Sequence, residues 1–122
     1  EELEIDYQLK LYQRRADNRL APDTYKALHP MGIAPVITDG AITLGESGAI
    51  CEYVSRKYGG GRLEPAIDSS DFADHLYWFH WSNATFMAGK LMQLALVMAG
   101  GGSEVPGFVT DRDRRAYEMM ER

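Results

Sequence analysis

The clearest pattern of apolar and polar positions in this chain lies between residues 35 and 58. Two short apolar runs, Pro-Val-Ile-Thr and Ala-Ile-Thr-Leu, stand on either side of Asp39-Gly40, a pair typical of a two-residue type I′ β-hairpin turn. From Ser47 to Tyr58 the apolar residues recur at helical spacing, and three consecutive glycines follow, as is typical of a helix end. The pattern predicts a β-hairpin followed directly by a helix.

Upstream of the hairpin the pattern is weaker but still readable. Alternating apolar and polar positions from Tyr7 to Gln13 predict a β-strand. Residues 22–28 predict a short helix that stops before Pro30, because the residue preceding a proline is disfavoured in the helical conformation. Pro35 has no backbone N–H to donate to a sheet, so we expect it at the first position of its strand.

The second half of the chain has the periodicity of helices. Phe72 to Met98 predicts one long helix, Gly100 to Ser103 a flexible linker, and Thr110 the N-cap of a last helix. A stretch with several glycines, a proline and few apolar residues separates this half from the hairpin region. We therefore expect a first domain over 1–60, a linker over 61–70 and a partial helical domain over 71–122.

Composition and charge narrow the class of protein. The chain is 45% hydrophobic and 25% charged, as ordinary globular domains are, and its net charge of −5 argues against a nucleic-acid partner. No run of about 18 apolar residues occurs, so we expect no membrane span. The single cysteine, Cys51, excludes an intramolecular disulfide and fits a reducing compartment. We interpret Cys51 as a packed small hydrophobe, with a reactive thiol as the alternative.

Metal binding has little support in the sequence. His75 and His80 are five residues apart, so they do not share a helical face as ligands at i and i+4 would. With His29 in a loop and a single cysteine, no zinc ligand set emerges, and we expect no metal.

The Glu46-Ser47 pair at the predicted helix start is the stronger candidate for chemistry. Backbone N–H groups without intrahelical partners and the helix dipole attract a carboxylate at such a position. Alone, the pair is also what an ordinary helix cap looks like. Preceded by Pro35 and by the hairpin at this spacing, it predicts a binding site for a peptide-like anion.

Residues 29–50 resemble the glutathione-binding domain of the cytosolic glutathione transferases of bacterial type. The shared pattern is Pro-x-Gly-x-x-Pro, an Asp-Gly hairpin and Glu-Ser-x-Ala-Ile. The resemblance implies the glutathione transferase fold, an α/β thioredoxin-like N-terminal domain followed by an all-α C-terminal domain. It also implies a cis bond before Pro35, pairing of the Ala34 backbone with the cysteinyl part of glutathione, and contacts of Glu46 and Ser47 with its γ-glutamyl end.

Compared with this family, the chain looks truncated at both ends. The family's first strand and first helix have no full counterpart here, and the Tyr, Ser or Cys that activates the glutathione sulfur lies between them. The catalytic residue is therefore unknown. Position 33, often Lys or Gln in the family, is Ile33, and the chain ends inside a helical pattern.

The long helix carries a second set of candidates. Tyr77, His80, Ala84, Met87 and Leu91 recur at i+3, i+4 and i+7, and residues so spaced share one face of an α-helix. By resemblance to bacterial members, His80 reaches the glutathione of the partner subunit, and Met87 stands where those members have His. Ala84 and Met87 would then border an apolar second-substrate pocket. The alternative is the core-facing stripe of an amphipathic helix, which we favour for the aromatic and Met residues; for His80 both interpretations stay open.

The resemblance implies attack of the glutathione thiolate on small electrophilic substrates, a detoxification reaction. It implies a cytoplasmic homodimer that uses glutathione as a substrate. Two alternatives stay open: a non-catalytic glutathione-binding or structural relative, and a glutathione-dependent thiol oxidoreductase. The absence of a Cys-x-x-Cys pair counts against the second alternative.

Overall fold

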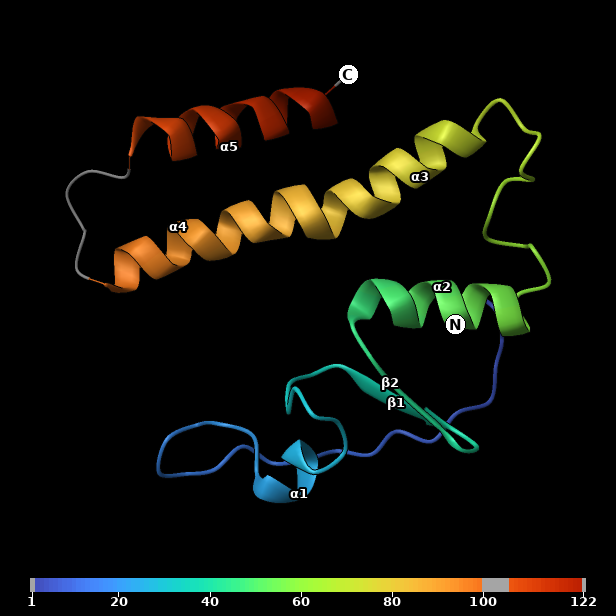
Figure 1. Cartoon of the computed structure of the whole chain (residues 1–122), viewed down its shortest axis with the longest axis vertical. Helices are drawn as coiled ribbons and strands as arrows, with labels where there is room; N and C mark the ends of the chain where they lie inside the picture. Colours follow the sequence, from blue (N-terminus) through green and yellow to red (C-terminus); the bar gives the residue numbers. More distant parts are fainter. Residues whose placement is uncertain (1, 100–105, 122) are drawn as a thin grey trace. The chain divides into compact units, whose positions relative to one another are not determined.

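The computed structural model describes residues 2–99 and 106–121. The flexible linker predicted at Gly100 to Ser103 lies outside these residues. The chain divides into two compact units, Glu1–Ser69 and Ser70–Arg122, and the division falls inside the stretch from 61 to 70. Figure 1 shows a hairpin and helices in the first unit and only helices in the second.

The first unit is built around one hairpin and the helix that follows it. Its elements are α1 (Asp23–Lys26), β1 (Val36–Asp39), β2 (Ile42–Gly45) and α2 (Ser47–Tyr58). The two strands pair antiparallel, and α2 begins two residues after β2 and packs against it (Figure 1). The predicted hairpin and α2, with both of its ends, are therefore confirmed.

The hairpin turn is one residue further along the chain than predicted. Asp39 pairs with Ile42, so the two loop residues are Gly40 and Ala41, and Asp39 belongs to the ladder. Gly40 has a φ of 58° while Ala41 has no positive φ, and a type I′ turn needs positive φ at both positions. The expected Asp39-Gly40 type I′ turn is therefore wrong. A positive φ at the first loop residue alone is what a type II′ turn requires.

The strand predicted from Tyr7 to Gln13 is also wrong. These residues have no regular secondary structure, and Tyr7, Leu9 and Leu11 are exposed. A strand exists only through hydrogen bonds to a neighbour, and the two strands of the described residues pair with each other. Alternation of apolar residues does not by itself supply a partner.

The first residues of the chain are attached to the end of α2. The Arg62 guanidinium donates to the carbonyl oxygen of Leu3 at 2.8 Å and to that of Gly59 at 3.3 Å. The side chain of Leu3 also lies close to Gly59, which is buried. The carboxyl end of α2 therefore fixes the segment that enters the unit.

The second unit consists of helices. Its elements are α3 (Phe72–His80), the π-helical segment η1 (Trp81–Met87), α4 (Ala88–Met98) and α5 (Gly107–Met120). The first three follow one another without a break, so the predicted long helix is right in extent and wrong in its middle. In a π-helix each N–H bonds to the carbonyl five residues earlier. Side chains after Trp81 therefore point in other directions around the helix axis than they would in an uninterrupted α-helix.

The last helix starts earlier than predicted. It begins at Gly107, after Pro106, and the Thr110 hydroxyl donates to the Gly107 carbonyl at 2.9 Å. Thr110 therefore lies inside the first turn and is not the N-cap. Proline fits immediately before a helix because its φ is already helical and it has no N–H to satisfy.

A small core joins α5 to the π-helical segment and α4. Trp81, Val109 and Ala116 are buried, and the Trp81 ring stacks on Phe86 with centroids 5.3 Å apart. Polar contacts surround this core. The Lys90 ammonium lies 2.8 Å from a carboxylate oxygen of Asp113, and the Arg112 guanidinium donates to the Thr85 carbonyl at 2.7 Å. The two charged contacts hold α5 against η1 and α4.

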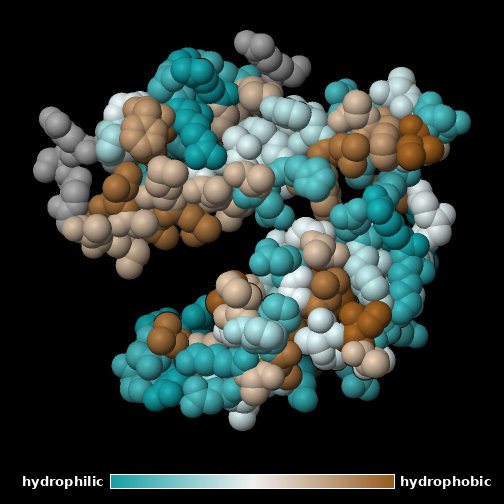
Figure 2. Space-filling view, in the orientation of Figure 1, coloured by the Kyte–Doolittle hydropathy of each residue, from teal (hydrophilic) through white to brown (hydrophobic). Residues whose placement is uncertain are grey.

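Apolar side chains also reach the surface along α4, where Figure 2 shows hydrophobic residues gathered. The exposed large members are Leu91, Met92, Leu94, Val97 and Met98. None of the helices within residues 2–99 and 106–121 is both long enough and apolar enough to cross a membrane.

Candidate functional site

The predicted binding residues of the first unit meet at the open end of the hairpin. Val36 pairs with Gly45 at the end of the ladder, and Pro35 and Glu46 are the chain neighbours of these two paired residues. The bond before Pro35 is cis, as expected. The strand register therefore brings a proline and the start of α2 to one place.

The start of α2 has the properties of an anion site. The helix is 12 residues long, and the first backbone N–H groups of any helix have no intrahelical partner and carry the positive end of the dipole. Glu46 precedes the helix with a φ of 68°, in the left-handed region that non-glycine residues rarely occupy. Such conformations cluster at functional sites. Ala34, Pro35, Glu46 and Ser47 are all exposed, so a ligand can reach them.

His29 belongs to this site and was missed from the sequence as a site residue. Its imidazole lies against Gly45, with three ring atoms 3.3–3.4 Å from the position that a Cβ on Gly45 would take. The ring nitrogen Nδ1 accepts the backbone N–H of Met31 at 3.3 Å. The contact joins residues 16 positions apart and is possible because Gly45 has no side chain, so no local pattern could reveal it.

The other end of the hairpin is held by a polar cluster that we call the Asp39 cluster (Asp39, Tyr53, Lys57 and Tyr58). One oxygen of the Asp39 carboxylate accepts from the Tyr53 hydroxyl at 2.9 Å, the Lys57 ammonium at 2.7 Å and the Tyr58 hydroxyl at 2.5 Å. Hydrogen bonds from Lys57, Tyr58 and Tyr53 lower the pKa of Asp39 to about 2, because each donor favours the charged carboxylate.

The Asp39 cluster has a structural role. It ties the last residue of β1 to the second half of α2, the half that lies away from Glu46. Hydrogen bonds to the same carboxylate and to Tyr53 raise the pKa of Lys57, so both members of the ion pair stay charged at neutral pH. The cluster therefore holds α2 on the hairpin and leaves the open end of the hairpin to the binding residues.

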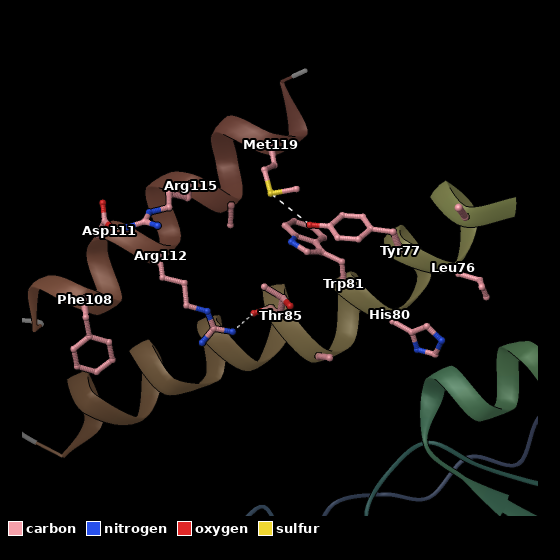
Figure 3. A pocket seen from close by; sticks show the side chains of 13 residues that line it. Leu76, Tyr77, His80, Trp81, Thr85, Phe108, Asp111, Arg112, Arg115 and Met119 are labelled. Carbon is pink, nitrogen blue, oxygen red and sulfur yellow. Dashed lines mark hydrogen bonds and ion pairs between the residues drawn. The ribbon is translucent and has the colours of Figure 1, made fainter. Parts of the chain in front are cut away.

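In the second unit a groove of about 810 Å³ runs between α5 and the helix formed by α3 and η1. Tyr77, His80 and Ala84 of the predicted face are among its lining residues, together with Trp81 and Met119. Figure 3 shows the Trp81 ring directed toward α5 and the hydroxyl of Tyr77 joined to the sulfur of Met119. This hydroxyl lies 3.6 Å from the sulfur.

Met87 and Leu91 of the same predicted face lie outside the residues that line the groove. Both are exposed. The face was counted at α-helical spacing, and the π-helical segment from Trp81 to Met87 changes that spacing. One row of side chains therefore continues from Tyr77 to Ala84 and is lost beyond it.

Within residues 2–99 and 106–121, no three His, Cys, Asp or Glu side chains are grouped so that they could hold a metal ion. Cys51 is exposed on α2, so its interpretation as a packed hydrophobe is wrong. Its position in a helix is right, but it lies on the face that does not pack.

Comparisons with known proteins point to one family. A sequence model described as "Glutathione S-transferase, N-terminal domain" matches residues 1–57. Glutathione S-transferase 3 of Schizosaccharomyces pombe is 38% identical over 87 residues, which are 71% of this chain and 35% of that protein. Glutathione S-transferase 4 of Zea mays is 42% identical over an alignment of 69 positions, and the match covers 52% of this chain and 30% of that protein.

A solved structure agrees with these relatives. The crystal structure of a glutathione S-transferase from Actinobacillus pleuropneumoniae superposes with a TM-score of 0.71 at 30% sequence identity. The match covers 93% of this chain and 51% of that one. The chain thus spans about a third of the length of the curated relatives and about half of the solved one.

Proposed function

Because this chain is a member of the glutathione S-transferase family, we propose that it supplies the glutathione site of an enzyme that joins glutathione to small electrophilic compounds. Its fold is the family's fold, a thioredoxin-like α/β domain followed by helices. The transfer reaction, its substrates and the residues that serve it are the content of the proposal.

One observation carries the proposal. Val36 pairs with Gly45, and their chain neighbours are Pro35, which follows a cis bond, and Glu46, which precedes α2. An extended peptide can then lay its backbone along Ala34 and direct a carboxylate at the helix start. Peptide backbone pairing and anion binding at a helix N-terminus are both established modes of recognition.

Glutathione has the chemistry that this arrangement would accept. In the proposal, the backbone of Ala34, next to Pro35, pairs with the cysteinyl residue. The hydroxyl of Ser47 and the N–H groups of α2 bind the carboxylate of the γ-glutamyl end, and the carboxylate of Glu46 binds its ammonium group. These are charge-assisted hydrogen bonds, which are stronger than neutral ones.

The reaction would be nucleophilic substitution at carbon. The glutathione thiolate attacks the electrophile, a C–S bond forms, and a leaving group such as a halide departs with its electron pair while the thiol proton goes to solvent. Positioning of thiolate and electrophile supplies part of the rate. We propose no residue of this chain as the one that lowers the pKa of the glutathione thiol.

The second unit enters the proposal through the long helix. By family resemblance, His80 would reach the glutathione of the partner subunit, and Ala84 and Met87 would border the electrophile. The groove lined by His80 and Ala84 supports a role for these two side chains in contact with a small molecule. Assembly as a homodimer, a cytoplasmic location and a detoxification role are part of the same proposal.

Isothermal titration calorimetry of the chain with glutathione tests the site. The dipeptide Cys-Gly, which lacks the γ-glutamyl end, should bind at least about tenfold more weakly, because one charge-assisted hydrogen bond contributes about 1.5–3 kcal/mol. Ser47→Ala should weaken glutathione binding by a similar factor and leave Cys-Gly unaffected. Ser82→Ala, whose hydroxyl donates to the Phe79 carbonyl in the second unit, is the matched control.

Two results would count against the proposal. Equal affinity for glutathione and Cys-Gly would show that the start of α2 does not bind the γ-glutamyl end. Glutathione binding without any product from 1-chloro-2,4-dinitrobenzene, measured on the enzyme that contains this chain, would identify a binding protein instead of a transferase.

A further inference from the structure

The space at Gly45 is filled by a side chain from another part of the unit. The three heavy atoms nearest to a Cβ at this position all belong to the His29 ring: Cε1 at 3.3 Å, and Nδ1 and Nε2 at 3.4 Å. Gly45 is buried and His29 is half-buried, while Glu46 and Ser47 next to them are exposed. The imidazole therefore lies beneath the residues proposed to bind the γ-glutamyl end.

Hydrogen bonds on both sides hold His29 within its loop. Nδ1 accepts the Met31 N–H at 3.3 Å, so the proton of the neutral imidazole resides on Nε2. The His29 carbonyl accepts the Gly32 N–H at 2.8 Å. This loop leads directly to Ala34 and Pro35. The same residue is therefore part of the segment proposed to pair with the cysteinyl part of glutathione.

We infer that His29 is a positioning residue of the glutathione site, which fixes the start of α2 relative to the Ala34–Pro35 segment. The inference rests on the proposed function. One side chain touches the strand end that precedes Glu46 and orders the loop that ends at Ala34. A ligand that contacts both segments then meets them already in place, and less free energy is lost to ordering them on binding.

The contact between His29 and Gly45 can be tested by a double-mutant cycle, which isolates the coupling between two residues. Gly45→Ala places a methyl group 3.3 Å from Cε1, which is closer than ordinary van der Waals contact, so the ring must shift. His29→Ala removes the ring and the acceptor for the Met31 N–H. We expect each single variant to bind glutathione about five- to tenfold more weakly, within the range of coupled neighbours.

The double variant should bind no more weakly than His29→Ala alone, because without the imidazole the added methyl group meets nothing at that distance. If the two losses multiply instead, the Gly45 effect does not pass through His29 and the inference is wrong. His29→Asn should recover most of the affinity, since the Asn side-chain oxygen can accept the Met31 N–H. Failure of Asn to improve on Ala would also overturn the inference.

A second ligand separates positioning from simple stability. Cys-Gly is proposed to contact only the Ala34 segment, so His29→Ala should reduce its affinity by a smaller factor than that of glutathione, as followed by NMR titration, because only the ordering of the loop is then lost. An equal loss for glutathione and Cys-Gly would reduce His29 to a structural residue of its own loop. Should His29→Ala fail to fold, Gly45→Ala and His29→Asn carry the same comparison.

The failure of the inference can be told from the failure of the proposed function. If the unmodified chain does not bind glutathione, the proposed function is at fault. If it binds glutathione and Ser47→Ala weakens binding, while His29→Ala and Gly45→Ala bind as the unmodified chain does, the glutathione site stands and the positioning role is rejected.

Discussion

Gly89 is buried near the start of α4 and faces Arg112 and Asp113 of α5. A Cβ at this position would lie 3.6 Å from Cζ of Arg112, 3.7 Å from a carboxylate oxygen of Asp113 and 3.8 Å from Nε of Arg112. These are ordinary van der Waals distances, so an alanine fits without moving α5. We predict that Gly89→Ala stabilises the second unit.

The size of the effect follows from two contributions. Alanine is favoured over glycine within a helix by about 0.5–1 kcal/mol, because glycine has more backbone freedom to lose on folding. Burying the added methyl group contributes up to about 0.8 kcal/mol more. The free energy of unfolding should therefore rise by about 1 kcal/mol, equivalent to roughly 4–8 °C in the melting temperature of a unit this small.

Urea unfolding followed by tryptophan fluorescence measures this directly. The chain has two tryptophans, Trp78 and Trp81, and both lie in the second unit, so the signal reports that unit. The midpoint should rise with an unchanged slope. Gly89→Val is the control, because its two further carbons reach into Arg112 and Asp113 and should lower the midpoint. A lower midpoint for Gly89→Ala would refute the reasoning, since it would mean that the α4–α5 contact tolerates nothing larger than glycine.

Two further predictions concern α2. Asp39→Asn should lower the unfolding midpoint at pH 7, because Lys57, Tyr53 and Tyr58 lose a charged acceptor. The pKa of Asp39 is lowered to about 2, so the stabilisation by its carboxylate is complete above the ordinary carboxyl pKa and is lost as the pH falls toward 2. The helical signal in far-UV circular dichroism should therefore decline less steeply from pH 4 to 2 for Asp39→Asn than for the unmodified chain. Parallel curves would contradict this prediction. Ser55→Ala should raise the free energy of unfolding of the first unit by roughly 1 kcal/mol, and with it the thermal midpoint, because the buried Ser55 hydroxyl has no hydrogen-bond partner in the described residues. A lower midpoint would show that this hydroxyl makes a hydrogen bond in solution.

The elements that carry the candidate site could be predicted because their signals are local. Two strands next to a glycine turn and a helix closed by three glycines are each encoded within a few residues, so the hairpin and α2 were predicted in the right order. Both bounds of α2 are right, while each strand begins and ends one residue later than predicted, so Pro35 precedes β1. The turn lies one residue further along because Asp39 pairs with Ile42 in the ladder, and the Asp39 side chain contacts Lys57, 18 positions away. No window of neighbouring residues contains that contact.

The remaining differences have the same origin. A strand from Tyr7 to Gln13 requires a partner, and periodicity says nothing about whether one is present. Cys51 follows an apolar residue in a helix, yet it lies on the exposed side. The role of His29 depends on the absence of a side chain at Gly45, where its ring lies. Each of these features is decided by packing between distant parts of the chain and not by the pattern along it.

The π-helical segment has a consequence for how this chain is aligned with its relatives. Each hydrogen bond of a π-helix spans five residues instead of four, so the segment Trp81–Met87 accommodates one residue more than the same stretch of an α-helix. Removing that residue would restore α-helical spacing and leave Lys90 facing Asp113 of α5. Relatives with an uninterrupted α-helix here can present the same side chains only if they are one residue shorter. A one-residue gap in such an alignment should therefore be accepted as real, because it keeps both halves of the helix facing the same neighbours.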